Sequence, residues 1–267
     1  MRILSYVGPD GPCAGVVEGD TVHRISAGVL DVVCGAPAER TGQTVPLDGL
    51  LIVVPMRPGK LIGIGLNYRD HAAETGKPIP DMPLLFAKMP TSVTGPAGPV
   101  RLPKYTSKPD FEGELAVVIG KVARDVTAAD ALGYVFGYAI MNDVSARDVQ
   151  QSEPQWVRAK GADTFAPWGP WITTADEVPD PQALSIRTWL SGELVQDGTT
   201  AEMVFGVADL IAFISASFTL EPGDVITTGT PAGVGVARTP PRYLCDGDVV
   251  RIEIAGLGAI EHPVVGA

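Results

Sequence analysis

The 267-residue chain is poor in cysteine and in basic residues, and it contains no long apolar run. Its three cysteines, Cys13, Cys34 and Cys245, are odd in number, widely spaced and without a C-x-x-C pair. This pattern argues against a disulfide framework. We therefore predict buried thiols in a reducing compartment.

The charge balance excludes two classes of partner. Lys and Arg together number 20 against 31 Asp and Glu, which gives a net charge of −11 at pH 7, and no basic cluster could neutralise a phosphate backbone. No apolar run approaches the ~18–20 residues that cross a bilayer. The N-terminus reaches Gly8 and Pro9 without an apolar signal segment. We predict a cytoplasmic protein with no nucleic-acid or membrane partner.

Glycine and proline, in contrast, are abundant, with 31 and 24 residues, and 45% of the chain is hydrophobic. This combination is typical of a turn-rich β protein and argues against both disorder and a helical bundle. One longer helix is predicted over residues 206–218, which Pro222 and Gly223 end. Its expected inner face is made of Val207, Leu210, Ile211, Ile214 and Phe218.

The strand pattern predicts an α+β fold that is predominantly β. The run 40–58, with three prolines, is the candidate linker. It would separate a small N-terminal β-rich domain, 1–58, from a larger domain, 59–267. Strands are predicted at 2–7, 13–18, 21–25, 60–66, 84–89, 114–120, 134–141, 170–174, 186–190, 225–228 and 249–254, and a short helix at 29–33.

Several familiar catalytic motifs are missing. The sequence has no G-x-S-x-G, H-E-x-x-H or Walker loop. Gly63-Ile64-Gly65 lacks the third glycine and the following helix of a dinucleotide site. A serine hydrolase and a nucleotide-dependent enzyme are therefore disfavoured.

Two glutamates alternate with apolar residues in the segment 110–119. Because strand residues alternate faces, Glu112 and Glu114 point the same way, with Leu115 on the other face. Neighbouring carboxylates repel in poorly hydrated surroundings unless a cation or a proton intervenes. Asp143, at the end of the predicted strand 134–141, would add a third carboxylate. The set favours Mg²⁺ or Mn²⁺ rather than zinc, the alternative being the solvated face of an amphipathic strand.

A second candidate cluster contains His71 and Glu74, which share one face of a predicted short helix. A carboxylate beside an imidazole orients its tautomer and raises its basicity, as a general base requires. The alternative is a solvated loop in which the pair is incidental. The segment 77–83 behind it is interpreted as a hinged loop or lid. His23 and His262 lie in plain strand contexts and are interpreted as structural.

Arg147 and Gln150, three residues apart, would share a face of a helical turn that we expect Ser145 to cap. They could hold a substrate carboxylate. A surface ion pair of Arg147 with Asp148 or Glu153 is the alternative.

Two later residues complete the candidates. Lys160 precedes a turn, where it could stabilise an oxyanion or enolate or could be simply solvated. Thr230 lies in a glycine-rich loop, 228–235, whose backbone and hydroxyl could approach a ligand closely.

Taken together, these segments resemble the fumarylacetoacetate hydrolase family from about Lys60 to the C-terminus. The matching stretches are GLNYRDHAAETG, FEGELAVVIGK, GYAIMNDVSARDVQ, KGADTFAPWGPW, LEPGDVITTGTPAGVG and PPRYLCDGDVV. Residues 1 to about 58 resemble, more loosely, the small N-terminal domain of many bacterial members. The resemblance implies a mixed β-sandwich roll, a homodimer and one Mg²⁺ or Mn²⁺ per subunit.

The resemblance also implies a role for each candidate residue. Ala162, at a position that is often aromatic in such enzymes, implies a larger pocket. The implied metal ligands are Glu112, Glu114 and Asp143; the implied catalytic residues are Lys160 and the acid–base pair His71 and Glu74; the implied substrate-binding residues are Arg147, Gln150, Thr230 and Asn142.

The reaction expected first is hydrolysis of a carbon–carbon bond in a β-diketo acid, as in an acylpyruvase or fumarylacetoacetate hydrolase, through a metal-bound enolate. The substrate would be a small 2-oxo acid. Two alternatives share the enolate step: decarboxylation of oxaloacetate, and isomerisation of 2-hydroxyhepta-2,4-diene-1,7-dioate in aromatic catabolism. An alternative of another class is a non-catalytic, ligand-binding member of the fold.

Overall fold

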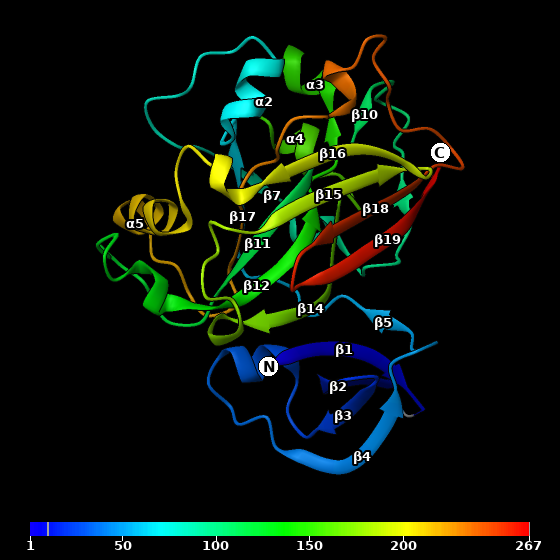
Figure 1. Cartoon of the computed structure of the whole chain (residues 1–267), viewed down its shortest axis with the longest axis vertical. Coiled ribbons are helices and arrows are strands. Elements are labelled where there is room, and N and C mark those ends of the chain that lie inside the picture. The colour runs from blue at the N-terminus through cyan, green and yellow to red at the C-terminus, as the bar shows by residue number, and fades with distance from the viewer. Residues whose placement is uncertain (10, 267) are drawn as a thin grey trace.

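The computed structural model describes residues 1–9 and 11–266, and these residues form a predominantly β fold, as predicted (Figure 1). Short helices flank the strands. The helices are α1 (Val29–Val33), α2 (Arg69–Glu74), α3 (Arg147–Ser152), α4 (Val157–Lys160) and α5 (Val207–Ser217), with 3₁₀ turns η1 (Pro90–Ser92), η2 (Ala131–Tyr134), η3 (Ala175–Glu177), η4 (Thr200–Glu202) and η5 (Gly235–Ala237). The strands are β1 (Arg2–Gly8), β2 (Gly11–Glu18), β3 (Thr21–Ile25), β4 (Arg40–Pro46), β5 (Ile52–Val53), β6 (Leu61–Gly65), β7 (Leu84–Lys88), β8 (Val93–Thr94), β9 (Val100–Arg101), β10 (Pro109–Asp110), β11 (Gly113–Ile119), β12 (Val135–Asn142), β13 (Ser145–Ala146), β14 (Ala166–Thr174), β15 (Ser185–Leu190), β16 (Glu193–Thr199), β17 (Val225–Thr227), β18 (Val249–Ile254) and β19 (Gly258–Val265).

Two sheets carry most of these strands. The larger runs β4-β3-β2-β1-β14-β12-β11-β17-β6-β7, and the five-stranded sheet runs β16-β15-β18-β19-β9. The N-terminal strands belong to the larger sheet because β1 pairs antiparallel with β14, with Ile3 opposite Ile172. Strands β1–β4 lie at one end of the molecule in Figure 1, and α2 and α3 lie at the other.

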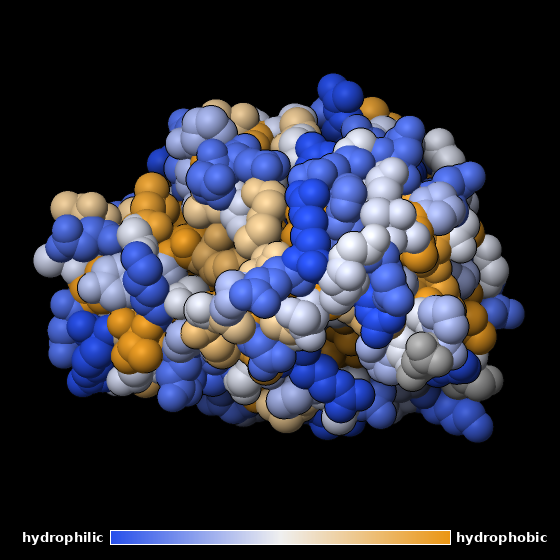
Figure 2. Space-filling view, turned by 90° about the horizontal axis from the view of Figure 1, so that it is seen from below, coloured by the Kyte–Doolittle hydropathy of each residue, from blue (hydrophilic) through white to orange (hydrophobic). Residues whose placement is uncertain are grey.

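The segment 40–58, which we interpreted as a linker, contains two strands. β4 pairs with β3 and β5 pairs with β1. All β4 residues except Val45 are exposed, so this edge strand carries no hydrophobic alternation that would reveal it in the sequence. Seen from the N-terminal end, the surface shows many hydrophilic residues with smaller hydrophobic groups between them (Figure 2).

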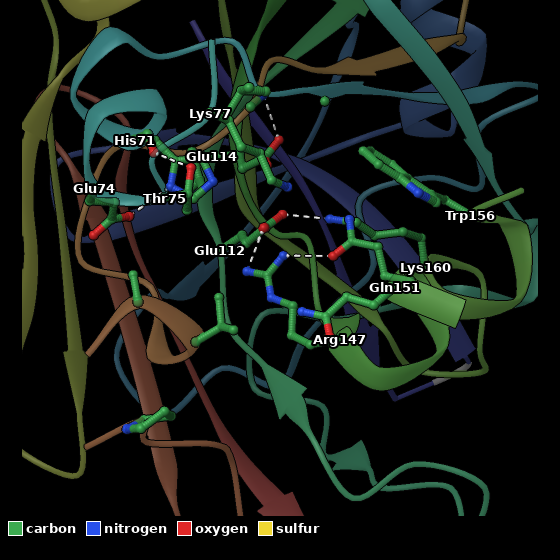
Figure 3. A pocket seen from close by; sticks show the side chains of 18 of the residues that line it. His71, Glu74, Thr75, Lys77, Glu112, Glu114, Arg147, Gln151, Trp156 and Lys160 are labelled. Atoms are coloured by element: carbon green, nitrogen blue, oxygen red, sulfur yellow. Dashed lines mark hydrogen bonds and ion pairs between the residues drawn. The ribbon is translucent and has the colours of Figure 1, made fainter. Parts of the chain in front are cut away.

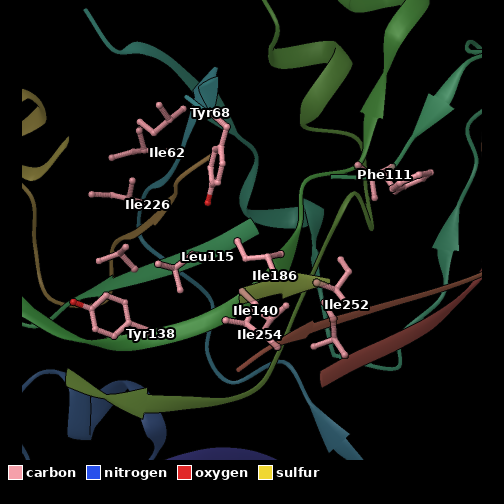
Figure 4. Packing of buried hydrophobic residues seen from close by; sticks show 14 of the residues in the cluster. Ile62, Tyr68, Phe111, Leu115, Tyr138, Ile140, Ile186, Ile226, Ile252 and Ile254 are labelled. Atoms are coloured by element: carbon pink, nitrogen blue, oxygen red, sulfur yellow. The ribbon is translucent and has the colours of Figure 1, made fainter. Parts of the chain in front are cut away.

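The main core lies between the two sheets. Leu115 and Ile140 on the larger sheet pack in one buried cluster with Ile186, Ile252 and Ile254 on the five-stranded sheet (Figure 4). The residues between them on β11 and β12, such as Ala116 and Ala139, are buried in a second cluster on the other face of the sheet. This packing brings β19 against β12, so residues far apart in the sequence meet behind the end of β12.

Helix α5 runs from Val207 to Ser217, close to the predicted range, and four of the five predicted inner residues are buried. Phe218 is the exception: it is 38% exposed and follows the last helical residue in an extended conformation. No helix among the described residues is long and apolar enough to cross a membrane.

Two smaller expectations were wrong. Only Cys13 is buried, whereas Cys34 and Cys245 are exposed, because both lie outside the apolar strands. Ser145 does not cap α3. It belongs to β13, its hydroxyl donates to the Asp143 carbonyl at 2.9 Å, and the residue before α3 is Ala146.

Candidate active site

Three carboxylates meet where β11 begins and β12 ends. These strands are antiparallel with Gly113 opposite Asn142, so Glu112, Glu114 and Asp143 lie side by side at one edge of the sheet. One oxygen from each lies within 4.8 Å of the others, and all three side chains are buried. The alternation therefore marks an inward cluster rather than a solvated strand face.

Three buried cations offset the charge of this cluster. The Lys160 Nζ lies 2.5 Å from Glu112 Oε2 and 2.8 Å from Asp143 Oδ2. The Lys88 Nζ lies 2.5 Å from Asp143 Oδ1. The Arg147 Nη2 lies 2.7 Å from Glu112 Oε1 (Figure 3). Such charges are tolerated away from water only when they are paired.

Lys88 is the member of this group that our sequence analysis missed. It ends β7, where the buried positions alternate as Phe86 and Lys88. A lysine at an inward position of a strand is the signal that could have revealed it. Burial lowers the pKa of Lys88 although Asp143 opposes the change, and its ammonium also donates to the Lys160 carbonyl oxygen.

The surroundings shift the pKa values of the two glutamates in opposite directions. Burial favours the neutral form of Glu112, but Arg147 and Lys160 outweigh it and hold its pKa well below the ordinary value. Burial, with the negative charges of Asp143 and Glu112, raises the pKa of Glu114 well above its ordinary value. Glu114 also accepts hydrogen bonds from Thr227 and, at 2.8 Å, from the Gly229 N–H. Because three oxygen ligands converge and one lacks a cation of its own, the residues fit a hard divalent ion.

His71 and Glu74 form the expected pair on α2. The His71 Nδ1 lies 2.7 Å from Glu74 Oε1, and the other carboxylate oxygen accepts from the Gly233 N–H at 2.9 Å. Since an ionised carboxylate only accepts, this contact places a proton on Nδ1, and in the neutral ring Nε2 is then the acceptor. Hydrogen bonds therefore fix both members of the pair, which argues against an incidental contact in a solvated loop.

A cavity of about 570 Å³ joins the two clusters (Figure 3). Asn142 and Asp143 do not line it. Of the candidates, it is lined by His71, Glu74, Glu112, Glu114, Arg147, Gln150, Lys160 and Thr230, and it also touches Lys77, Gln151, Trp156 and Arg238.

Arg147 is held inside the protein and not in a surface ion pair. Its Nε donates to Asp110 at 2.8 Å and its Nη1 to Gln150 at 3.1 Å. Burial by itself would lower the pKa of Arg147. The neighbouring carboxylates of Glu112 and Asp110 outweigh burial and raise the pKa above its ordinary value, so the guanidinium stays charged. The surface alternative fails because Asp148 bonds to Thr106 and Ser107, and Glu153 pairs with Arg158.

The other two candidate substrate-binding residues, Thr230 and Asn142, are also bonded to protein groups. The Thr230 hydroxyl donates to the Gly113 carbonyl at 3.0 Å and accepts from Gln196 at 2.8 Å, while still lining the cavity. Asn142 is fully buried behind the carboxylates, with both ends of its amide bonded to protein. We expected Asn142 near the substrate; its side chain is bonded between the two sheets and does not line the cavity.

Ala162 also lies elsewhere. It lines a separate surface hollow of about 380 Å³ with Met89 and Tyr105, so it does not enlarge the cavity described above.

Residues 60–265 match the family described as fumarylacetoacetate (FAA) hydrolase, C-terminal, and residues 1–55 match one described as Rv2993c-like, N-terminal. The chain belongs to the fumarylacetoacetate hydrolase family. The first match covers every residue of the acidic cluster and of the His71–Glu74 pair. The bounds 1–58 and 59–267 stay our prediction for the domains.

Relatives that are named for different activities resemble this chain along its whole length. Protein Rv2993c from Mycobacterium tuberculosis is 42% identical over 268 residues, which cover 99% of this chain and 98% of the relative. A 2-hydroxyhepta-2,4-diene-1,7-dioate isomerase from Mycobacterium marinum is 40% identical with a TM-score of 0.87, covering 100% and 98% of the two chains. A fumarylacetoacetate hydrolase from Exiguobacterium antarcticum is 36% identical with a TM-score of 0.91, covering 100% of both. Isomerases and hydrolases therefore share this fold.

Proposed function

We propose that this protein is a Mg²⁺- or Mn²⁺-dependent enzyme that isomerises a 2-hydroxy-diene dicarboxylate of the 2-hydroxyhepta-2,4-diene-1,7-dioate type. One observation carries the proposal: a single cavity joins the carboxylate cluster to the hydrogen-bonded His71–Glu74 pair. The likeness to the isomerase from Mycobacterium marinum supports this reaction over the hydrolysis that we expected first.

Glu112, Glu114 and Asp143 would hold the ion. When bound, the ion would polarise the 2-oxygen of the substrate and screen the neighbouring carboxylate. Lys160 and Arg147 surround Glu112 and keep it ionised, ready to act as a ligand.

The chain's own residues would supply the proton transfer. The dienol loses the proton of its 2-hydroxyl, gains one at carbon 5, and its double bonds shift from positions 2 and 4 to the 2-oxo group and position 3. His71 has its proton on Nδ1, held by Glu74, so its Nε2 can accept a proton and return it. No water or other co-reactant is consumed.

The size and charge of the cavity support a dicarboxylate. About 570 Å³ is more than a four-carbon acid fills, and two cations, Lys77 and Arg238, line it in addition to Lys160 and Arg147. Arg238 is paired with Glu193. Lys77 is exposed and follows α2, so we assign it to the distal carboxylate.

Hydrolysis of a β-diketo acid is the second candidate. The same Nε2 of His71 could activate a water for attack on the distal carbonyl, and the likeness to the hydrolase from Exiguobacterium antarcticum favours this possibility. Decarboxylation of oxaloacetate would use the same site without an attacking water.

A proton NMR time course in D₂O separates the three reactions. The diene dioate, acetylpyruvate and oxaloacetate are each incubated with Mg²⁺, with and without chelator. We expect metal-dependent appearance of the 2-oxo-3-ene product with one deuteron at carbon 5. Release of acetate and pyruvate would establish hydrolysis instead, and loss of CO₂ alone would establish decarboxylation. Binding of Mg²⁺ and oxalate with no turnover would identify a non-catalytic member.

Two further predictions accompany this function: a homodimer, and a cytoplasmic location. Light scattering during gel filtration would measure the mass of the assembly directly. A mass near 27.9 kDa, that of one chain, would overturn the dimer.

A further inference from the structure

His262 lies on β19, between β18 and β9 in the five-stranded sheet, with no exposed surface. It does not line the cavity and contacts none of the three carboxylates. Its Nε2 lies 2.9 Å from the Nδ2 of Asn142, which ends β12 on the larger sheet. This contact joins the two sheets directly behind the candidate metal ligands.

The partners of Asn142 determine which way its amide points. The Oδ1 of Asn142 accepts from the Glu112 N–H at 3.0 Å, so Nδ2 must face His262. Nδ2 only donates, and therefore Nε2 of His262 must be an acceptor, with the ring proton on Nδ1. Burial lowers the pKa of His262 to about 3, which agrees with a neutral ring.

The amide holds the backbone where two ligands begin. Glu112 precedes β11, and its N–H is bonded by the Asn142 side chain. The Glu112 carbonyl in turn accepts from the N–H of Asp143, the residue after Asn142, at 2.9 Å. A reversed amide would turn an NH₂ group toward the Glu112 N–H and break this arrangement.

The backbone N–H of Gly113, the residue after Glu112, is also bonded by a side-chain amide. Gln196 on β16 accepts from the Gly113 N–H at 3.0 Å and donates to Thr230 at 2.8 Å. The five-stranded sheet thus bonds directly to the Gly113 N–H through Gln196, and His262 contacts the Asn142 amide that bonds to the Glu112 N–H. Most other buried residues of that sheet are apolar, and Thr188 on β15 is a buried polar exception.

We propose that His262 is a positioning residue for the acidic cluster: its Nε2 selects the orientation of the Asn142 amide that holds Glu112 in place to bind a metal ion. The inference rests on the metal site of the proposed function. Groups behind metal ligands typically change metal affinity by roughly 10–100-fold when they are replaced.

The test measures binding of Mn²⁺ alone to the full chain by electron paramagnetic resonance. We expect H262L to weaken Mn²⁺ binding roughly tenfold or more, and H262Q, whose amide can accept from Asn142, to stay within about threefold of the wild type. His23→Leu is the matched control, since His23 lies on β3 beside Glu18 and away from the cavity. Thermal unfolding without metal verifies that each variant is folded.

Two measurements separate positioning from simple packing. ¹⁵N NMR of the imidazole should show the proton on Nδ1 in the folded wild type. In a double-mutant cycle, H262L should have little further effect on Mn²⁺ binding once Asn142→Leu is present, because the amide it orients is gone.

The outcomes are distinct. A wild type that fails to bind Mn²⁺ would overturn the metal-dependent function itself. A wild type that binds, with H262L binding equally well, would overturn the role of His262 alone. Three other results would also overturn the role of His262 alone. They are a proton on Nε2 of the His262 ring, additive effects of H262L and Asn142→Leu on Mn²⁺ binding, and a loss of Mn²⁺ affinity in H262Q as large as in H262L. If H262L does not fold, H262Q and the imidazole spectrum still decide the question.

Discussion

The two ends of the molecule differ in where their ion pairs lie: on the surface at the N-terminal end, and buried in the candidate active site. In the N-terminal strands, Glu18 pairs with Arg40 and His23 on the surface, and the Glu18 side chain is 52% exposed. In the candidate active site, Asp143 is paired with Lys88 and Lys160 with no exposure. Surface pairs contribute little to stability, whereas buried charges are costly to desolvate. Buried clusters of this kind are typical of functional sites, and this one is our candidate active site.

The largest effect is expected from Glu114→Gln. The raised pKa of Glu114 means that glutamine imitates the protonated form of the metal-free protein. Removing this ligand should lower metal-dependent turnover by about 10³-fold or more, while the metal-free unfolding temperature stays close to that of the wild type. Steady-state kinetics and calorimetry measure both. Glu261→Gln, on an exposed side chain of β19, is the control. Full activity of Glu114→Gln would contradict the metal role.

His71→Ala should lower kcat by ~10²–10⁴-fold, because a positioned general base contributes about that much. Mn²⁺ binding should be unchanged, since His71 is not a ligand. Glu74→Gln should have a smaller effect, because the imidazole remains. His23→Ala is the matched control. Wild-type proton exchange at carbon 5 in His71→Ala would assign the acid–base step to another group.

Lys88→Met tests the comparison between the two ends directly. It removes one of the two cations that pair with Asp143 and should lower the free energy of unfolding by about 3–5 kcal/mol. Arg40→Met, which breaks the surface pair with Glu18, should leave stability unchanged within error. Denaturant titrations compare the two variants. Equal losses of unfolding free energy in the two variants would show that the buried ion pair contributes no more to stability than the surface pair.

Lys77→Gln sharpens the assignment of the substrate. If Lys77 binds a distal carboxylate, KM for the diene dioate should rise by roughly tenfold while kcat changes little. A monocarboxylate analogue should be unaffected. Lys104→Gln, an exposed lysine outside the cavity, is the control. An equal rise for both substrates would remove the dicarboxylate argument.

The smallest effect concerns pH. In the metal-free protein the pKa of Glu114 is raised, so above its ordinary value of 4.5 the folded state binds a proton that the unfolded chain has lost. Stability should therefore fall as pH rises above 4.5, until the raised folded-state pKa of Glu114 is passed, and Mg²⁺ should remove this slope. Glu112 has a lowered pKa and acts on the other side of 4.5, where its contribution is lost as pH falls. Thermal unfolding with chelator checks the slope, which Glu114→Gln should lack.

Local patterns predicted most of the strands and α5 because apolar alternation and helical spacing are visible in adjacent residues. β4 was missed because its exposed residues carry no such pattern, and β16 was missed because the polar residue Gln196 occupies an inward position. For β19, only the strand context of His262 was predicted, without bounds. Those inward polar residues bond to partners on other strands. The residues next to them in the sequence give no indication that these polar side chains are buried.

The sequence by itself determined the predominantly β fold, the family, and nearly all the candidate residues, since these depend on composition and on short motifs. Only the tertiary structure decided how those residues are used. It brought Lys88 to Asp143 from 55 residues away and His262 to Asn142 from 120 residues away, and it turned Asn142 from the cavity toward the backbone of Glu112. The physical reason is that hydrogen bonds and ion pairs act over a few ångströms of space. The distance along the chain does not limit them.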